Sequence, residues 1–472
     1  MIQLSWRGAL ALALFPAAFL GLSALGVYRY RHADPTGIAE PLPIPTPERP
    51  ALPLSVSPGQ RYLVQKNGAP FLIQGEAAWS LIAQLQRPEA EQYFEDRRRR
   101  GFNFLIISLI EHFFSDHPPL DAYGGAPFKV DWDFSTPNDE YFKRAHEMLR
   151  LAGEKGFVVL LCPAYLGGDG SPEGYYVEMR KSGPAKLRKY GEYVGALMRD
   201  LDNVMWMAGG DFTPPAAQLE LVDALQQGIR QSAPEQLQIA HWSPETSGLD
   251  VKLPNVKMDL NTTYTYHPAH LKSLLDYDHG NGPPHFLVES KYEGDLLGTT
   301  QRWVRAQAYY ALLTGATGQV FGNRWLWTFT LPNAWNRLTG RNWKASLDSP
   351  STRSMGFVRL LFEKLPWTRL VPDETFEVLT SGQGSRGSLE YPVLSWTRDG
   401  RLAVAYVPGK PADIELGKLS GPVRARWYDP TSGEFRDVPG SPFAASGNRS
   451  FARPGRNHAG DPDWVLLLET AH

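Results

Sequence analysis

Cysteine is nearly absent from this sequence of 472 residues, which contains only Cys162. A single cysteine excludes an intramolecular disulfide, and its place in the apolar run 157–162 indicates a buried structural thiol. No cysteines and histidines cluster at the spacing of metal ligands. We therefore predict no metal site and no cofactor.

An excess of charge of either sign is lacking as well. Lysine and arginine total 48, and aspartate and glutamate total 50, which leaves a formal charge of −2. A nucleic-acid partner therefore has no electrostatic support. We also find no internal repeat.

Aromatic residues, in contrast, are abundant, with 14 tryptophans and 20 tyrosines. One interpretation is a large hydrophobic core. The other is a set of platforms on which the C–H faces of sugar rings stack. The composition leaves both interpretations open.

One long apolar run, residues 9–28, follows Arg7 near the N-terminus. The run is long enough to span a bilayer and contains a signal-peptidase-like site at 24–26, but Arg29 and Arg31 directly after it are unusual for a cleaved signal. We predict that residues 1–34 are a cleaved signal peptide or a retained anchor that tethers the protein to a membrane through residues 9–28. The protein is then secreted, periplasmic or membrane-anchored. A proline-rich linker, residues 35–58, follows.

Short apolar runs alternate with amphipathic stretches from about residue 61 onward. The expected strands are 71–75, 102–109, 157–162, 204–208, 237–241, 256–260, 285–288 and 319–321. The expected helices include 88–100, 138–154, 185–201, 216–231 and 300–313. Such alternation is typical of a parallel sheet with crossover helices, and eight strands over roughly 260 residues match a (β/α)₈ TIM barrel.

A doubly wound open sheet is the rival architecture. Its first strand is usually followed by a glycine-rich turn. Here the first expected strand runs into Gly-Glu-Ala-Ala-Trp at 75–79, which is no phosphate-binding loop. We therefore predict an α/β protein with a TIM-barrel catalytic domain over residues 59–367.

The pattern changes after about residue 368. Helical stretches vanish, and short alternating runs appear with turn signals between them, at 394–396, 402–407, 423–428 and 464–468. We predict a small all-β sandwich domain over residues 368–472, acting as a structural partner of the barrel.

Two carboxylates at strand ends are the most informative feature of the chain. Asp211 follows the fourth expected strand, and Glu289 ends the seventh. A charge at the end of a buried strand is costly unless it is used or paired. Strands three apart in an eight-stranded barrel face each other across its active-site mouth. Two carboxylates in one pocket are the minimal machinery for hydrolysing a glycosidic bond.

The local sequence suggests a role for each carboxylate. Two glycines and Trp206 precede Asp211, an apolar setting that would raise the pKa of its carboxyl, so we assign Asp211 as the general acid/base. Glu289 lies near Lys291 and other polar groups, so we expect it to stay ionised and act as the nucleophile. For either residue the structural alternative is a carboxylate paired with arginine or lysine.

The remaining strand ends carry polar and aromatic side chains suited to a sugar pocket. The expected substrate-binding residues are Glu76, Trp79, His112, Tyr165, His241, Tyr266, His267, Glu293 and Trp325. For any single histidine or tyrosine among them, a structural role is the alternative.

Five motifs together resemble the apiosidase-like glycoside hydrolases, which are glycoside hydrolase family 140 and its relatives. They are Gly-Glu-Ala-Ala-Trp at 75–79, Trp-Met-Ala-Gly-Gly-Asp at 206–211, Glu-Ser-Lys-Tyr-Glu at 289–293, Trp-Tyr-Asp-Pro at 427–430 and Asp-Trp-Val-Leu at 463–466. The resemblance implies a TIM barrel joined to a C-terminal β-sandwich that is often labelled a collagen-binding domain. It also matches Asp211 and Glu289 to the family's catalytic pair.

Two positions depart from the pattern of that family. Glu76 stands where aspartate is usual, and Ser290 stands where a proline often follows the first glutamate. These changes bear on the family's apiose specificity more than on its chemistry.

We therefore expect an exported glycoside hydrolase with a carbohydrate substrate and a retaining mechanism. The alternative is a non-catalytic carbohydrate-binding or cell-surface scaffold protein that kept the barrel fold. The distance between the two carboxyl groups distinguishes them, since roughly 5–5.5 Å indicates a retaining enzyme and roughly 6.5–9.5 Å an inverting one. A much larger separation would favour the scaffold.

Overall fold

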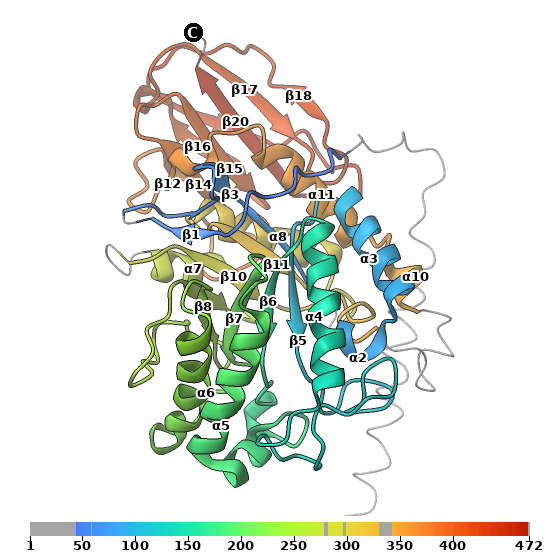
Figure 1. Ribbon diagram of the computed structural model, residues 1–472. Coiled ribbons are helices and arrows are strands. Elements are labelled where there is room, and N and C mark those ends of the chain that lie inside the picture. The colour runs from blue at the N-terminus through green and yellow to red at the C-terminus, as the bar shows by residue number, and fades with distance from the viewer. Residues whose placement is uncertain (1–43, 58, 278–281, 296–298, 330–341, 471–472) are drawn as a thin grey trace, which may run out of the picture.

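The computed structural model describes residues 44–57, 59–277, 282–295, 299–329 and 342–470. Its larger part is a nearly closed barrel of eight parallel strands, which confirms the predicted α/β barrel (Figure 1). The strands are β4 (Ile73–Ala77), β5 (Phe104–Ser108), β6 (Val158–Cys162), β7 (Val204–Gly209), β8 (Gln238–His241), β9 (Asn261–Tyr264), β10 (His285–Glu289) and β11 (Gly318–Phe321).

Helices surround the barrel between successive strands, as the periodicity predicts. The longer ones are α3 (Arg87–Arg99), α4 (Asp139–Glu154), α5 (Tyr176–Met198), α6 (Leu219–Ser232), α7 (His270–Tyr277), α8 (Gln301–Leu313) and α11 (Pro350–Phe362), and the short ones are α2 (Leu81–Gln84) and α10 (Trp343–Ser346). Side-chain caps fix several of their starts. Asn138, Thr300 and Ser349 each accept a hydrogen bond from a backbone N–H in the first turn of α4, α8 and α11 respectively.

The sheet has one open seam, between β8 and β9. The hydrogen-bonded order runs β8-β7-β6-β5-β4-β11-β10-β9, and no ladder joins the two end strands in the part of the chain described. Instead, the Thr262 hydroxyl donates to the carbonyl of Ala240 at 2.6 Å, and the Asp259 N–H donates to the carbonyl of Gln238 at 2.7 Å.

The prediction of a strand over 256–260 is wrong, because the sixth barrel strand is β9, Asn261–Tyr264. This strand is fully buried yet polar, so it lacks the apolar run that marks the others. Two of its polar side chains make hydrogen bonds with neighbouring elements. The Thr263 hydroxyl donates to Asp276 at 2.5 Å, and Asn261 accepts from the backbone N–H of Leu249 at 3.0 Å.

The C-terminal part is all β, as predicted. A six-stranded antiparallel sheet has the order β12-β14-β15-β20-β17-β18, and a three-stranded sheet has the order β13-β16-β19. The strands are β12 (Leu370–Pro372), β13 (Leu379–Ser381), β14 (Val393–Thr397), β15 (Leu402–Val407), β16 (Ala412–Glu415), β17 (Val423–Tyr428), β18 (Phe435–Asp437), β19 (Asn448–Phe451) and β20 (Trp464–Thr470). A further small sheet, β1 (Ser55–Val56), β2 (Leu63–Val64) and β3 (Pro70–Phe71), precedes the barrel.

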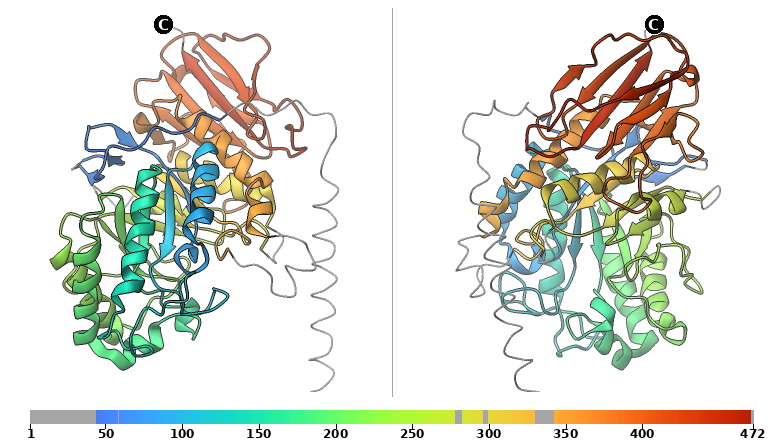
Figure 2. Two further views of the ribbon diagram at one scale, coloured as in Figure 1. Left: turned by 45° about the vertical axis from the view of Figure 1, so that its right-hand side comes forward. Right: turned by 180° about the vertical axis from the view of Figure 1, so that it is seen from behind.

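Strands β14 and β15 of the larger sheet in this C-terminal part are buried on both faces. Along β15, Ala403 and Ala405 belong to the core of the sandwich, whereas Val404 and Tyr406 belong to the same core as the barrel helices. Figures 1 and 2 show the sandwich seated on one end of the barrel, beside α8 and α11. The two parts therefore share one continuous apolar core.

A buried ion pair crosses this interface. The Arg305 guanidinium of α8 donates to both oxygens of Asp463, at 2.7 and 2.6 Å, and also to Asp461 at 2.6 Å. The Tyr406 hydroxyl donates to Asp463 at 3.0 Å. Burial alone would raise the pKa of Asp463, but Arg305 holds that pKa below its ordinary value.

No helix within the described residues combines the length and the apolar character needed to cross a bilayer. The predicted signal or anchor, residues 1–34, lies outside the described residues together with the proposed tether at 9–28.

Candidate active site

A left-handed turn presents Asp211 at the end of β7. Gly209, Gly210 and Asp211 have φ angles of 89°, 110° and 53°. A Cβ on Gly209 would lie 2.4 Å from the carbonyl oxygen of His241, and one on Gly210 would lie 2.5 Å from Cδ2 of Tyr165. Only glycine fits the first two positions, and aspartate is among the few residues that tolerate the third.

Glu289 reaches the same place from the opposite wall of the barrel, as the last residue of β10. One oxygen of its carboxylate lies within 4.8 Å of one oxygen of Asp211. The Tyr165 hydroxyl donates to Asp211 Oδ2 at 2.8 Å. The two side chains differ in burial, since 23% of the Asp211 side chain is exposed and only 7% of the Glu289 side chain.

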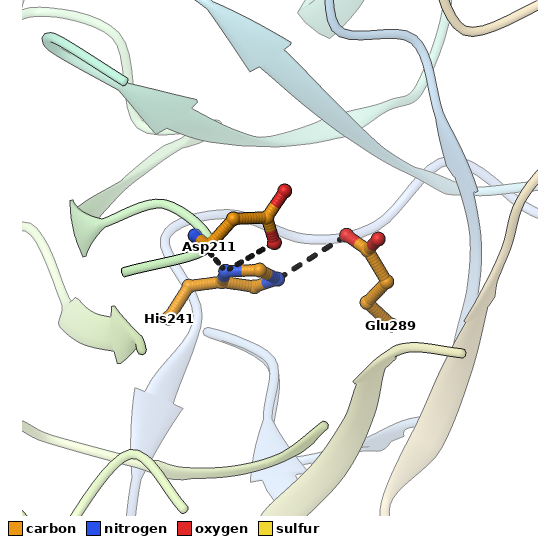
Figure 3. A group of neighbouring side chains, drawn as sticks. All are labelled: Asp211, His241 and Glu289. Atoms are coloured by element: carbon orange, nitrogen blue, oxygen red, sulfur yellow. Dashed lines mark hydrogen bonds and ion pairs between the residues drawn. The ribbon is translucent and has the colours of Figure 1, made fainter. Parts of the chain in front are cut away.

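His241, at the end of β8, is fully buried between the two carboxylates (Figure 3). Its Nδ1 accepts a hydrogen bond from the backbone N–H of Asp211 at 3.2 Å. Its Nε2 lies 3.3 Å from Glu289 Oε2. Because Nδ1 is an acceptor, the neutral imidazole carries its proton on Nε2, the ring nitrogen on the side of Glu289.

The charges of this trio influence one another. Burial, followed by the negative charge of Asp211, raises the pKa of Glu289 to about 7, although hydrogen bonds from His241 and Tyr292 oppose the rise. Burial alone would lower the pKa of His241, but the two carboxylates raise it above its ordinary value. The sequence argument placed the desolvated setting at Asp211 and the polar setting at Glu289. That argument is wrong, because Glu289 is the more buried group.

A cavity of about 220 Å³ opens over this pair. Aromatic rings form much of its wall, and they belong to Trp79, Phe114, Tyr165, Tyr266, Tyr292 and Trp327. The polar lining consists of Ser108, Glu111, Glu173, Asp211, Glu289 and Asp295. Aromatic faces combined with fixed acceptors suit a polyhydroxylated ring, whose C–H faces are apolar and whose hydroxyls donate hydrogen bonds.

Asp211, His241 and Glu289 are also the groups whose geometry could hold a metal ion among the described residues, with one ligand atom each within 4.8 Å of the others. His241 Nδ1 already accepts from the Asp211 N–H, and its Nε2 faces Glu289.

A family model described as the catalytic domain of apiosidase-like proteins matches residues 57–369. The chain belongs to the apiosidase-like family. This membership confirms the predicted glycoside hydrolase, and the non-catalytic scaffold loses its support. A second model, described as "Putative collagen-binding domain of a collagenase", matches residues 378–469 of this apiosidase-like chain.

Solved structures share the whole architecture of this apiosidase-like protein. One is a protein named "Glycoside hydrolase", with a TM-score of 0.76 and 20% identity, which covers 89% of this chain and 97% of its own. Another is a glycoside hydrolase family 5 protein from Bacteroides vulgatus ATCC 8482, also with a TM-score of 0.76 and 20% identity, which covers 90% and 95%. At this identity the likeness concerns the fold. A search of curated proteins gives no match.

Several residues that the sequence analysis selected do meet at the cavity of this apiosidase-like protein. Trp79, Tyr165 and Tyr266 line it together with Asp211 and Glu289. The Trp79 indole donates to the Tyr292 hydroxyl at 3.0 Å, so it also orients a neighbour of Glu289. His241, expected to contact substrate, lies instead between the two carboxylates.

Glu76 and Glu293 lie away from the cavity, contrary to expectation. Glu76 is completely buried, pairs with Arg97 at 2.9 Å and accepts from the Tyr93 hydroxyl at 2.5 Å. Glu293 is buried, accepts from Asn323 at 2.9 Å and caps the start of α11 through Ser349. Both carboxylates therefore satisfy their hydrogen bonds inside the protein, where burial raises the pKa of each.

The other three expected residues also lie outside the lining. His112 packs its ring 4.7 Å from Trp132 and places Nε2 3.4 Å from Glu178. His267 is exposed, and its carbonyl accepts from Gln307. The ring of Trp325 lies against Gly294, so close that a Cβ on Gly294 would be 2.4 Å from the ring.

Sequence reasoning missed part of the lining. Phe114 and Glu173 lie well beyond the ends of β5 and β6, inside long loops, and Asp295 follows β10 by six residues. These residues lie too far along their loops to be identified by a position directly after an expected strand. Glu111 and Trp327 did follow expected strands, but nothing in the sequence favoured them over His112 and Trp325.

Proposed function

We propose that this apiosidase-like protein is an exported retaining glycosidase, with Asp211 as general acid/base and Glu289 as nucleophile. The observation that carries the proposal is the approach of their carboxylate oxygens to within 4.8 Å in one cavity. Retaining enzymes hold their two carboxyl groups at roughly 5–5.5 Å, whereas inverting enzymes leave room for a water between them.

Burial and the negative charge of Asp211 both raise the pKa of Glu289. Because both are partly or fully removed from water, ionisation of one disfavours ionisation of the other. One protonated and one ionised carboxyl is the state that the first step of a retaining mechanism requires.

Hydrogen-bond donors oppose this rise in the pKa of Glu289. His241 Nε2 and the Tyr292 hydroxyl both face its carboxylate and act to lower its pKa. A proton on Asp211 would remove the like charge that raises the pKa of Glu289. Asp211 is also the more solvent-exposed of the two, which suits a group that must later exchange protons with water.

The reaction then has two steps. Glu289 attacks the anomeric carbon while Asp211 gives its proton to the leaving oxygen, so the glycosidic bond breaks and a glycosyl ester forms. Asp211, now ionised, takes a proton from water, and the resulting hydroxide displaces Glu289 from the sugar. Both side chains return to their starting states.

The substrate is proposed to be a polysaccharide or oligosaccharide outside the cytoplasm, as the apolar run at 9–28 suggests. The decisive experiment incubates the protein with plant and bacterial polysaccharides and aryl glycosides and measures released sugar. Glu289→Gln is the matched control. Release by the wild type that the variant lacks supports the proposal, and equal release by both proteins refutes it.

A further inference from the structure

A tightly built turn follows β5 at the rim of the cavity. The Glu111 side chain accepts hydrogen bonds from the backbone N–H groups of His112, Phe113 and Phe114, at 2.9, 3.3 and 3.2 Å. Its second oxygen accepts from the Ser80 hydroxyl at 2.7 Å. The buried Glu111 side chain therefore fixes the shape of this turn from the inside.

Tyrosine hydroxyls hold the backbone of the same turn. The Tyr175 hydroxyl donates to the carbonyl of Glu111, and the Tyr141 hydroxyl donates to the carbonyl of Leu109, each at 2.9 Å. The side chains at the tip of the turn thus project from a backbone that is already ordered. Ordering of this kind lowers the entropy cost of binding.

Phe113 sits at the tip and is 60% exposed. A single exposed apolar residue is ordinary on a protein surface, but an apolar ring that continues a binding cavity marks an interaction site. The Phe113 ring lies 5.3 Å from that of Phe114, which lines the cavity and lies 4.8 Å from Trp327 and 6.2 Å from Tyr165. A row of ring contacts thus leads from the exposed Phe113 through Phe114 to Tyr165, whose hydroxyl donates to Asp211.

We propose that Phe113 is an outer stacking subsite for the sugar unit next to the one held in the cavity. The inference rests on the proposed function and makes a chain of at least two sugar units, rather than a lone glycoside, the preferred substrate. The C–H face of the outer ring covers the exposed phenyl face, and the Glu111 turn holds that face in place before the substrate arrives.

The test compares Phe113→Ala with the wild type on two substrates of the same sugar. One is an oligosaccharide released from the polysaccharide that the enzyme cleaves, and the other is the glycosyl fluoride, which is too small to reach Phe113. We expect kcat/KM to fall by about tenfold for the oligosaccharide, since stacking on an exposed ring buries apolar surface, and to stay unchanged for the fluoride. Phe113→Trp should restore activity on the oligosaccharide.

Val130→Ala is the matched control, since Val130 is 57% exposed in the same loop region between β5 and α4. Equal losses on both substrates, or the same pattern in Val130→Ala, would overturn the outer subsite while leaving the hydrolase intact.

A binding measurement tests the outer subsite at Phe113 even if no hydrolysis is found. Glu289→Gln is run by affinity electrophoresis in gels containing soluble xyloglucan, arabinan, galactan or glucomannan, with and without Phe113→Ala. Retardation that Phe113→Ala abolishes supports the subsite. Retardation that Phe113→Ala leaves unchanged contradicts it, and so does the absence of retardation in every gel.

Discussion

The carboxylate of Glu289 is buried, with only 7% of its side chain exposed to solvent. Its pKa in the folded protein is about 7, above the ordinary value of a glutamate, so the folded state binds this proton more tightly than the unfolded state does. Stability from this group is fully present at low pH and is lost as the pH rises from about 4.5 to about 7. The charged active site is therefore less stable than a neutral one would be.

Glu289→Gln should accordingly stabilise the protein at neutral and alkaline pH. We expect a gain of up to about 3 kcal/mol at pH 8 and almost none at pH 4, because glutamine removes a buried charge that is present only at the higher pH. Denaturant unfolding at both pH values measures the difference. Glu235→Gln, at an exposed position, should change neither value, and a loss of stability at pH 8 in Glu289→Gln would contradict the account.

The same substitution should abolish turnover, as should Asp211→Asn. Each variant loses a group that forms or breaks a bond, so we expect kcat to fall by at least about 10²- to 10⁴-fold. Circular dichroism should report an unchanged fold. Near-normal turnover by either variant, on a substrate that the wild type cleaves, would remove that residue from the mechanism.

The pH profile tests the coupling between the two carboxylates. The wild type should give a profile of kcat/KM whose acidic limb is set by the ionisation of Glu289, with its raised pKa of about 7. In Asp211→Asn, assayed on an activated aryl glycoside that needs little acid assistance, the acidic limb should move to lower pH because the like charge beside Glu289 is gone. An acidic limb that stays in place would argue against Glu289 as the ionised nucleophile.

At the scale of elements, the strand-to-turn junction after β7 places Asp211, the proposed acid/base residue. Gly68 and Gly210 both have positive φ, but a Cβ on Gly68 meets nothing within 4 Å, whereas one on Gly210 meets Tyr165. Each alanine substitution should cost about 1–2 kcal/mol of stability for its backbone conformation. Only Gly210→Ala should also lower kcat, by at least about tenfold, because the clash displaces Tyr165 and with it Asp211. Equal kcat values for the two variants would exclude this positioning.

The elements that could be predicted from the sequence are those whose burial leaves an apolar signal. β7 is apolar, and β10 is apolar from Phe286 to Val288, so both strands and the two carboxylates at their ends were identifiable. β9 is buried but polar, with side-chain hydrogen bonds in place of an apolar run, so the apolar pattern did not identify this strand. Its Tyr264 hydroxyl shares a 2.6 Å hydrogen bond with Tyr266, a pairing that no strand pattern encodes.

The sequence identified the site residues that reach the cavity because they follow a strand. It did not identify the residues whose place depends on packing against distant parts of the chain. Trp79 and Glu76 lie three residues apart, yet one lines the cavity and the other is buried against Arg97. The local sequence around Glu76 does not show that this glutamate pairs with Arg97 on α3. The burial of Glu289, which reversed the pKa argument, likewise depends on residues from distant strands.

At the scale of the whole molecule, the Arg305–Asp463 pair joins the two parts of the chain. Asp463→Asn leaves the Arg305 charge poorly compensated in a buried place, so we expect a loss of about 3–5 kcal/mol. Asp437→Asn, which disrupts the largely exposed pair with Arg424, should cost at most about 1 kcal/mol. Thermal or denaturant unfolding measures both. Similar losses in the two variants would mean that the interface pair contributes no more than a surface pair.

Removal of residues 368–472 should yield an insoluble barrel. The face of the six-stranded sheet that carries Val404 and Tyr406 covers apolar side chains of α8 and α11, and its loss exposes them to water. Expression and size-exclusion chromatography test this expectation. A well-behaved and fully active truncation, or saturable collagen binding by the separate sandwich, would contradict a structural role.

The seam between β8 and β9 leaves the barrel open along one line, and Asp211, His241 and Glu289 come from both sides of this seam. Asp211 and His241 stand on one side of it, and Glu289 stands on the other. Heating that loosens the barrel at this seam would separate the Asp211 and Glu289 carboxylates before the rest of the protein unfolds. Activity should therefore fade at a lower temperature than the folded structure does, and the amides of β8 and β9 should exchange with deuterium ahead of those in β5 and β6.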